Sequence, residues 1–201
     1  MPTTLKPRKK PTQTRSTVTV DAIVEATIRI LRQDGWAACA TTRIAALAGV
    51  SVGSLYQYFP NRNAIAVEII RQRTRTYLAA VLAADLTGAA TPDEAVDRAI
   101  AAFVIEKRKG LDVSLALRDA LPEVQGRQAI IEEARTFVPS LQARLAAAGA
   151  AIPDAARLAL ALAAVEGMVW EMIAQDVAAI DRPEAIASLS SVFKAAAGFR
   201  P

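Results

Sequence analysis

The stretch Thr41–Arg62, TTRIAALAGVSVGSLYQYFPNR, decides the fold, because it predicts two short helices joined by a tight turn. An apolar stripe along the first of these helices is expected from Ile44, Ala45, Leu47 and Ala48. Gly49 stands where the chain must leave this helix, a position that favours a positive φ, and Val50 fills the corner that follows.

The second helix of the stretch has a buried rear and a polar front. Ser51 is expected to be its N-cap, since a serine hydroxyl can accept a hydrogen bond from a free backbone N–H. Leu55 and Phe59 are four residues apart and therefore share the buried face. The other faces carry small or polar groups. A short helix of this kind is typical of insertion into the major groove of DNA.

The residues Thr41–Ala45 and Ala48–Phe59 resemble the helix-turn-helix of the tetracycline-repressor (TetR/AcrR) family of bacterial transcriptional regulators. The resemblance extends from about Val20 to about Ile70 and does not continue past the first third of the chain. It implies a three-helix DNA-binding head, followed by a helical body that binds a ligand and forms a dimer, about nine helices in all. The alternative is a helical hairpin with a purely structural role.

The composition favours an all-α protein. Apolar residues make up 53% of the 201 residues, many of them alanine, and few segments alternate between apolar and polar residues as strands do. We find no apolar run long enough to cross a bilayer and no signal-like N-terminus, so we expect a cytoplasmic protein without a membrane partner.

The rare residue types exclude several classes of chemistry. Histidine is absent, which removes the commonest general base and the commonest metal ligand. The single cysteine, Cys39, excludes an intramolecular disulfide and is interpreted as a small packed hydrophobe rather than a redox sensor. Phosphate-binding glycine patterns are missing as well. We therefore expect no enzyme, no metal and no cofactor.

Positive charge is concentrated at the start of the chain. Residues 1–62 carry nine Lys or Arg and three acidic residues, whereas the remainder carries fifteen and seventeen. This asymmetry indicates that only the first third meets a polyanion. Residues 1–17 are predicted to be a disordered basic arm, either lying along DNA or simply solvated.

The predicted domains are the arm 1–17, a DNA-binding domain 18–64, and an effector-binding and dimerisation domain 65–201. The first helix is expected to start at Thr19 or Val20, with Thr19 as N-cap, and to end at Gly35, after which Trp36 enters the core. Further helices are predicted at about 64–84, 92–108, 111–120, 123–148, 153–178 and 183–197.

Three local patterns refine these helices. Asn61 is expected to cap the helix that starts near residue 64. Thr91 and Glu94 form a capping-box pattern at the start of the helix near 92. Pro139 lies inside the helix 123–148 and is expected to kink or break it.

The resemblance also implies which residues contact DNA. They lie in the first helix of the motif, along the second, and just after it: Thr42, Arg43, Ser51, Val52, Gly53, Ser54, Tyr56, Gln57, Tyr58 and Arg62. Gln57 is the best candidate for reading a base, because its amide can pair with adenine. Arg43 is expected to contact a phosphate or a guanine, and Arg62 a phosphate. Ordinary packing is the alternative for the tyrosines.

A ligand pocket is expected in the body. Its candidate lining residues are Phe103, Leu117, Leu121, Phe137, Glu166, Met168, Trp170 and Met172. Glu166 or Arg135 would be the polar handle, and the effector would be apolar or weakly polar. The alternative is that these residues are simply core.

The leading functional hypothesis is a ligand-responsive repressor that binds a palindromic operator as a homodimer and is released by a small apolar effector. The last two long helices would form the dimer, since Ala156, Ala159 and Ala163 allow close helix approach. The alternatives are a constitutive or architectural DNA-binding protein, and a helical enzyme or interaction module.

Overall fold

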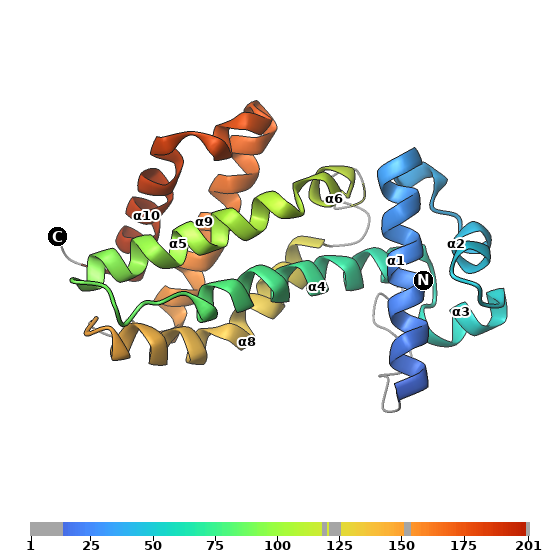
Figure 1. Cartoon of the computed structure of the whole chain (residues 1–201), viewed down its shortest axis with the longest axis horizontal. Helices are drawn as coiled ribbons and strands as arrows, with labels where there is room; N and C mark the ends of the chain where they lie inside the picture. Colours follow the sequence, from blue (N-terminus) through green and yellow to red (C-terminus); the bar gives the residue numbers. More distant parts are fainter. Residues whose placement is uncertain (1–13, 118–119, 121–125, 151–153, 200–201) are drawn as a thin grey trace. The chain divides into compact units, whose positions relative to one another are not determined.

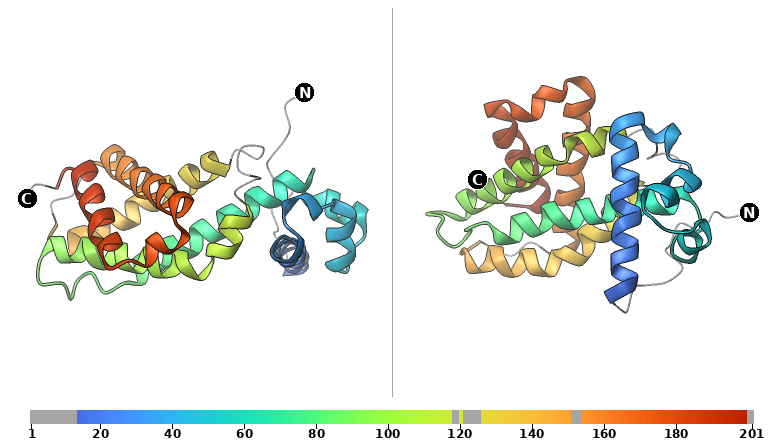
Figure 2. Two further views of the ribbon diagram at one scale, coloured as in Figure 1. Left: turned by 90° about the horizontal axis from the view of Figure 1, so that it is seen from above. Right: turned by 45° about the vertical axis from the view of Figure 1, so that its right-hand side comes forward.

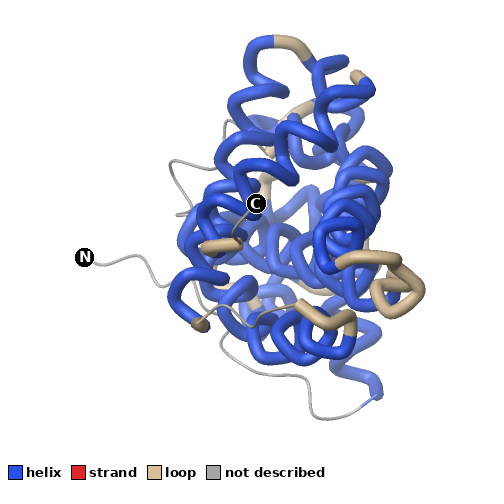
Figure 3. The backbone as a smooth tube through the Cα atoms, turned by 90° about the vertical axis from the view of Figure 1, so that its left-hand side faces the viewer, coloured by secondary structure: helices blue, strands red, loops and turns tan. Residues whose placement is uncertain are grey.

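The computed structural model describes residues 14–117, 120, 126–150 and 154–199. Within these ranges the chain forms nine α-helices and two short 3-10 helices, and no described residue lies in a strand (Figure 3). The prediction of an all-α fold is confirmed.

Figure 1 labels the α-helices along the chain. Their bounds are α1 Thr14–Asp34, α2 Thr41–Leu47, α3 Val52–Tyr58, α4 Arg62–Ala83, α5 Pro92–Lys109, α6 Leu111–Ala116, α8 Gly126–Ala147, α9 Ala155–Gln175 and α10 Pro183–Ala197. The 3-10 helices are η1 Trp36–Ala38 and η2 Val177–Asp181.

The chain divides into two compact units. The first comprises Met1–Arg73 and Gly110–Ile130, and the second Thr74–Lys109 and Ile131–Pro201. Helix α4 therefore begins in the first unit and ends in the second. The functional boundary expected after residue 64 stays a prediction.

The first unit is built around one apolar core. Its largest fully buried side chains come from α1 to α4 and include Ile23, Ile30, Leu31, Ile44, Leu55, Phe59, Ile65 and Ile69. Trp36 is buried in this core, as the sequence predicts. Val113 and Leu117 join it, and Arg32 Nε of α1 donates to Asp112 of α6 over 2.6 Å.

Two local expectations for this unit are wrong. Helix α1 begins at Thr14 rather than at Thr19 or Val20, so Thr19 is an internal residue and no N-cap. The segment between contains neither proline nor glycine, so nothing in it stops the helix from extending. Leu47 is 43% exposed, because two residues on from the buried Ala45 the helix has turned it to the opposite side.

The second unit is held together by α5, α9 and α10. Helix α10 packs along α9 and also contacts α5 (Figure 2). Buried residues recur at helical spacing on both partners: Leu158, Ala161, Val165, Val169 and Ile173 on α9, and Ala185, Leu189, Phe193 and Ala197 on α10. The pattern fits helices that bury one face each.

Helix α9 also corrects an expectation about membranes. Over the described residues, it is the one helix whose length and composition would suffice to span a bilayer, so the expectation that no such run exists is wrong. This is weak evidence for a span, since one face of α9 is buried against α10 and core helices pass the same criterion.

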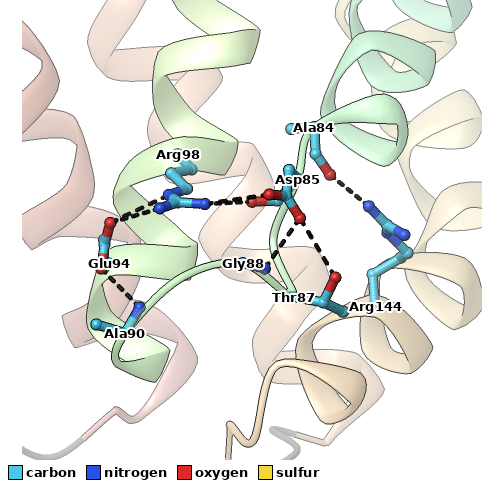
Figure 4. Close-up of polar contacts among 8 residues, drawn as sticks. All are labelled: Ala84, Asp85, Thr87, Gly88, Ala90, Glu94, Arg98 and Arg144. Atoms are coloured by element: carbon cyan, nitrogen blue, oxygen red, sulfur yellow. Dashed lines mark hydrogen bonds and ion pairs between the residues drawn. The ribbon is translucent and has the colours of Figure 1, made fainter.

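The loop between α4 and α5 is fixed by side chains (Figure 4). Asp85 accepts hydrogen bonds from the Thr87 hydroxyl and the Gly88 N–H, and Arg98 Nη1 lies 3.5 Å from its carboxylate. The predicted cap is present: the Glu94 N–H donates to Thr91 Oγ1 over 3.1 Å, while Glu94 accepts from the Ala90 N–H.

The remaining helices follow the predicted order with shifted ends. Helix α8 runs through Pro139 without a break, and α6 ends at Ala116, before the expected 120. Asp154 caps α9 by accepting from the Arg157 N–H over 2.9 Å. Helix α9 ends at Gln175, before the expected 178, and Asp176 then caps η2 by accepting from the Ala178 N–H.

Candidate DNA-binding surface

The two-helix motif has the turn that its residues predict. Gly49 ends α2 with φ of 67°, and the Val50 N–H donates to the Ala45 carbonyl over 3.0 Å. Ser51 Oγ accepts from the Ser54 N–H over 3.0 Å and so caps α3. Leu55 is fully buried, which fixes the rear of α3 against the core.

The front of the motif faces solvent. Seven of the ten predicted DNA contacts are exposed: Thr42, Arg43, Ser51, Val52, Gly53, Tyr56 and Gln57. Ser54, Tyr58 and Arg62 are half-buried, and Tyr58 packs in part against the core. The motif thus offers an accessible face of small and hydrogen-bonding groups. Contact of each residue with DNA remains a prediction.

Several groups on this face are available to a partner. Thr42 and Gln57 have no side-chain hydrogen bond to any residue that the structure describes. A Cβ added at Gly53 would meet only Ser51 Oγ, at an ordinary 3.8 Å. The φ of Gly53 is not in the left-handed region, so the fold itself places no demand for glycine there. A close approach of another molecule to the backbone would require glycine at this position.

Hydroxyl pairs tie the two helices and the cap together. Thr41 Oγ1 and Tyr56 Oη lie 3.1 Å apart, linking the start of α2 to α3. Ser51 Oγ and Ser54 Oγ lie 2.8 Å apart. The Thr41–Tyr56 contact was not expected from the sequence, because it depends on the angle between the helices.

Arg43, a predicted DNA contact, is already paired. Its Nη2 lies 2.5 Å from Asp34 Oδ2 at the end of α1, and both side chains are about half exposed. Sequence reasoning missed this partner, since residues nine apart on different helices carry no periodic signal.

Arg62 is positioned by Trp36. Its guanidinium lies 4.8 Å from the centre of the indole ring, and Nη1 donates to the Trp36 carbonyl over 3.4 Å. Asn61 Oδ1 accepts from the Ala64 N–H over 2.9 Å and caps α4 beside it. The cap was predicted from the sequence, whereas the stacking was not.

Cys39 fits its interpretation as a packed hydrophobe. It is fully buried, and its Sγ donates to the Gly35 carbonyl over 3.7 Å. Burial raises the pKa of the thiol above its ordinary value, against the opposing effect of Arg62 and Arg43. Across the residues that can be described, no three potential His, Cys, Asp or Glu ligands gather around a metal position.

The predicted pocket residues do not all belong to one unit. Phe103, Phe137 and Glu166 are buried in the second unit, where Met168, Trp170 and Met172 are half-buried. Leu117 belongs to the core of the first unit, Leu121 lies outside the described residues, and Arg135 is exposed. Whether any of them binds a ligand remains a prediction.

Glu166 has a buried partner that sequence reasoning missed. Lys107 Nζ lies 2.5 Å from Glu166 Oε1. The only signal in the sequence was that Lys107 lies within the apolar pattern of α5. A lysine there is explained equally well as part of the basic last turn of the helix.

The motif matches the model of a known protein family. Residues 23–69 match the family model described as bacterial regulatory proteins, tetR family. The match covers α2 and α3 together with most of α1 and the start of α4. No curated protein sequence matches the chain.

Solved structures share the fold over nearly the whole chain. A TetR-family transcriptional regulator from Streptomyces coelicolor is 21% identical with a TM-score of 0.62, covering 92% of this chain and 98% of its own. The fatty acid degradation regulator FadR from Bacillus halodurans is 18% identical with a TM-score of 0.58, covering 95% and 97%.

A third structure is similar to the same extent. The TetR family repressor AlkX from Dietzia sp., implicated in biodegradation of n-alkanes, is 15% identical with a TM-score of 0.59, covering 90% of this chain and 94% of its own. At these identities the likeness concerns the fold.

Proposed function

Because residues 23–69 place this chain in the TetR family of bacterial transcriptional regulators, we propose that it is a repressor that binds a palindromic operator as a homodimer. A small effector bound in the second unit releases it. The protein acts in the cytoplasm, where its operator lies.

One observation carries the DNA-binding part of the proposal. The rear of α3 is buried through Leu55, while its front presents Gln57 and Gly53 to solvent without a partner among the described residues. A seven-residue helix with this polarity suits the width of the major groove. The Gln57 amide then reads a base, while Thr42 and Tyr56 bind phosphates.

The dimer would form through α9 and α10. The outer side of α9 carries exposed small and apolar residues, among them Ala156, Ala163 and Leu160, the last being 61% exposed. On α10 the exposed Ala187, Ser191 and Ala195 recur every four residues. Such faces allow helices of two subunits to approach closely. A two-fold dimer then presents two copies of α3 to successive major grooves.

The effector part of the proposal is supported by the second unit and by two similar structures. The second unit has a core of its own, and two of the similar structures are a fatty acid degradation regulator and a repressor implicated in biodegradation of n-alkanes. We propose that an apolar or weakly polar compound binds near Phe103, Phe137, Met168, Trp170 and Met172, with Glu166 as polar handle. Its binding changes the spacing of the two recognition helices, which requires different affinities for the two conformations.

Selection from a random pool of DNA duplexes tests the DNA-binding proposal. We expect the purified chain to enrich a two-fold symmetric sequence. Gln57→Ala should then lose about 1–3 kcal/mol of discrimination at one base pair of each half-site while keeping its affinity for unrelated duplexes. Fluorescence anisotropy on the selected duplex and its point variants measures both quantities.

The exposed Gln33 of α1 lies outside the motif and supplies the control. Gln33→Ala should keep the selected sequence and its affinity. If the pool yields no enriched sequence, or if the enriched sequence has no symmetry, the proposed operator recognition is wrong. Operator binding that no effector weakens would instead favour the constitutive alternative.

A further inference from the structure

A buried ion pair lies inside an aromatic cluster of the second unit. Lys107 Nζ of α5 pairs with Glu166 of α9, and the nitrogen lies 4.8 Å from the ring centre of Tyr77, 5.2 Å from Trp170 and 5.9 Å from Phe103. Tyr77 comes from the part of α4 that belongs to this unit. The cluster therefore joins α4, α5 and α9.

Stability alone does not account for this pair. Removing two charges from water costs several kcal/mol per ion, and well-packed apolar residues of the same size often stabilise a protein as well or better. The surrounding residues of this unit are largely apolar. A charged pair kept in such a place is a candidate for recognition of a polar group.

The lysine side of the pair is closed. Lys107 is only 2% exposed, and its ammonium is faced by three aromatic rings in addition to Glu166. The rings themselves are fixed, since Tyr77 and Phe103 pack edge to face at 5.2 Å. A ligand would have to displace rings to reach the nitrogen.

On the glutamate side, one carboxylate oxygen has no hydrogen-bond donor among the described residues. Glu166 Oε1 accepts both from Lys107 Nζ and from Trp170 Nε1, the latter over 2.9 Å. No described residue donates a hydrogen bond to Oε2, and the Glu166 side chain is 12% exposed. The half-buried indole of Trp170 lies beside it. This arrangement leaves one carboxylate oxygen ready to accept, next to an aromatic surface.

The charge of the pair restricts the ligand. Lys107 and Glu166 neutralise each other, so a cationic ligand at Oε2 would add a second positive charge near the buried ammonium. An anionic ligand would meet the carboxylate itself. Neither repulsion is screened well inside a protein. A neutral ligand with a hydroxyl or amide N–H faces neither cost.

We propose that Glu166 Oε2 and the indole of Trp170 form the recognition point for the effector, and that the effector is a neutral, largely apolar molecule carrying a hydrogen-bond donor. This inference rests on the proposed function in taking the second unit as the effector domain. Lys107 acts as the positioning residue, because its ion pair fixes the carboxylate.

Four probes of similar length test the proposal by isothermal titration calorimetry on the full chain without DNA: 1-octanol, 1-methoxyheptane, octanoate and octylammonium. We expect 1-octanol to bind about ten- to a hundredfold more tightly than each of the others, since a hydrogen bond to a charged acceptor contributes this much. Another ranking, or no binding by any probe, would overturn the proposal.

The double variant Lys107→Met with Glu166→Met removes both charges without leaving either one unpaired. It should bind 1-octanol and 1-methoxyheptane equally, within about twofold, while Ser140→Ala, on the exposed side of α8, should keep the wild-type ranking. Retention of the ranking by the double variant would overturn the role of Glu166. If the double variant does not fold, the ranking of the four probes by the wild-type chain still decides whether the proposal stands.

The assay contains no operator, so its result is separate from the DNA-binding proposal. Loss of base discrimination by Gln57→Ala together with a failed probe ranking would retain the regulator and reject this effector class. The reverse result would retain the ligand site and reject operator recognition.

Discussion

At the scale of single residues, Gly53 is a glycine that the fold itself does not require. A Cβ there would find ordinary contact with Ser51 and no clash. Glycine inside a helix costs about 0.5–1 kcal/mol relative to alanine. The chain therefore keeps a destabilising residue on the exposed front of α3, which is expected where a backbone must approach a surface closely.

Gly53→Ala should separate stability from binding. We expect the free energy of unfolding to rise by about 0.5–1 kcal/mol, because the helix propensity improves. Operator affinity should fall at least tenfold as the new methyl group meets the DNA. Urea denaturation and anisotropy measure the two effects. Unchanged operator affinity would mean that α3 does not lie close to the groove.

Asp34 competes with DNA for Arg43. Their ion pair is half exposed, so it contributes only about 0.2–1 kcal/mol, and phosphates can replace it. Asp34→Asn should therefore strengthen operator binding by about two- to fivefold at low salt, with the gain shrinking as salt increases. Titrations at several salt concentrations measure this.

Asp112→Asn is the matched control, because Asp112 pairs with Arg32 outside the motif. It should leave operator affinity and its salt dependence unchanged. Equal gains for both variants would point to a general loss of negative charge rather than to release of Arg43.

At the scale of elements, helix ends were predictable from short sequence patterns. Ser51, Asn61 and Thr91 cap the helices that follow them, as expected, because a cap needs only a side chain and backbone three residues on. One failure arose where no local signal stops the helix, since α1 extends back to Thr14. At Pro139 a local signal was present, but the break it allowed for is absent, because α8 continues through the proline.

Glu94 makes the stability of the start of α5 depend on pH. Its pKa is lowered by the hydrogen bond from the Ala90 N–H and by that from Arg98. A carboxyl whose folded-state pKa is depressed contributes stability above its unfolded-state pKa and loses it as the pH falls through the folded value. Melting curves should show Glu94→Gln less sensitive than wild type to acidification below about pH 4.5.

The comparison needs only the difference between the two melting temperatures at each pH. That difference should be largest near neutral pH and shrink as the pH falls. A constant difference would mean that the carboxylate charge is irrelevant to the cap.

At the scale of the whole molecule, the proposed dimer depends on the exposed face of α9. Leu160→Glu places a charge in the centre of this face and should convert the dimer to a monomer. Operator affinity should fall by at least tenfold, since one subunit alone engages a single half-site. Analytical ultracentrifugation and anisotropy report the two changes.

Ile105→Glu is the control, because Ile105 is 56% exposed on α5, outside the proposed interface. It should leave both mass and affinity unchanged. A wild-type chain that sediments as a monomer at the concentrations used for operator binding would contradict the dimer outright.

The sequence alone determined the all-α fold, the helix-turn-helix with its buried Leu55 and Phe59, and most helix caps, because periodicity and capping act over a few residues. Tertiary structure decided the pairings of Lys107 with Glu166, Arg43 with Asp34 and Arg62 with Trp36. Each joins different helices, so it depends on how the helices pack, and helix packing leaves no short-range pattern in the chain.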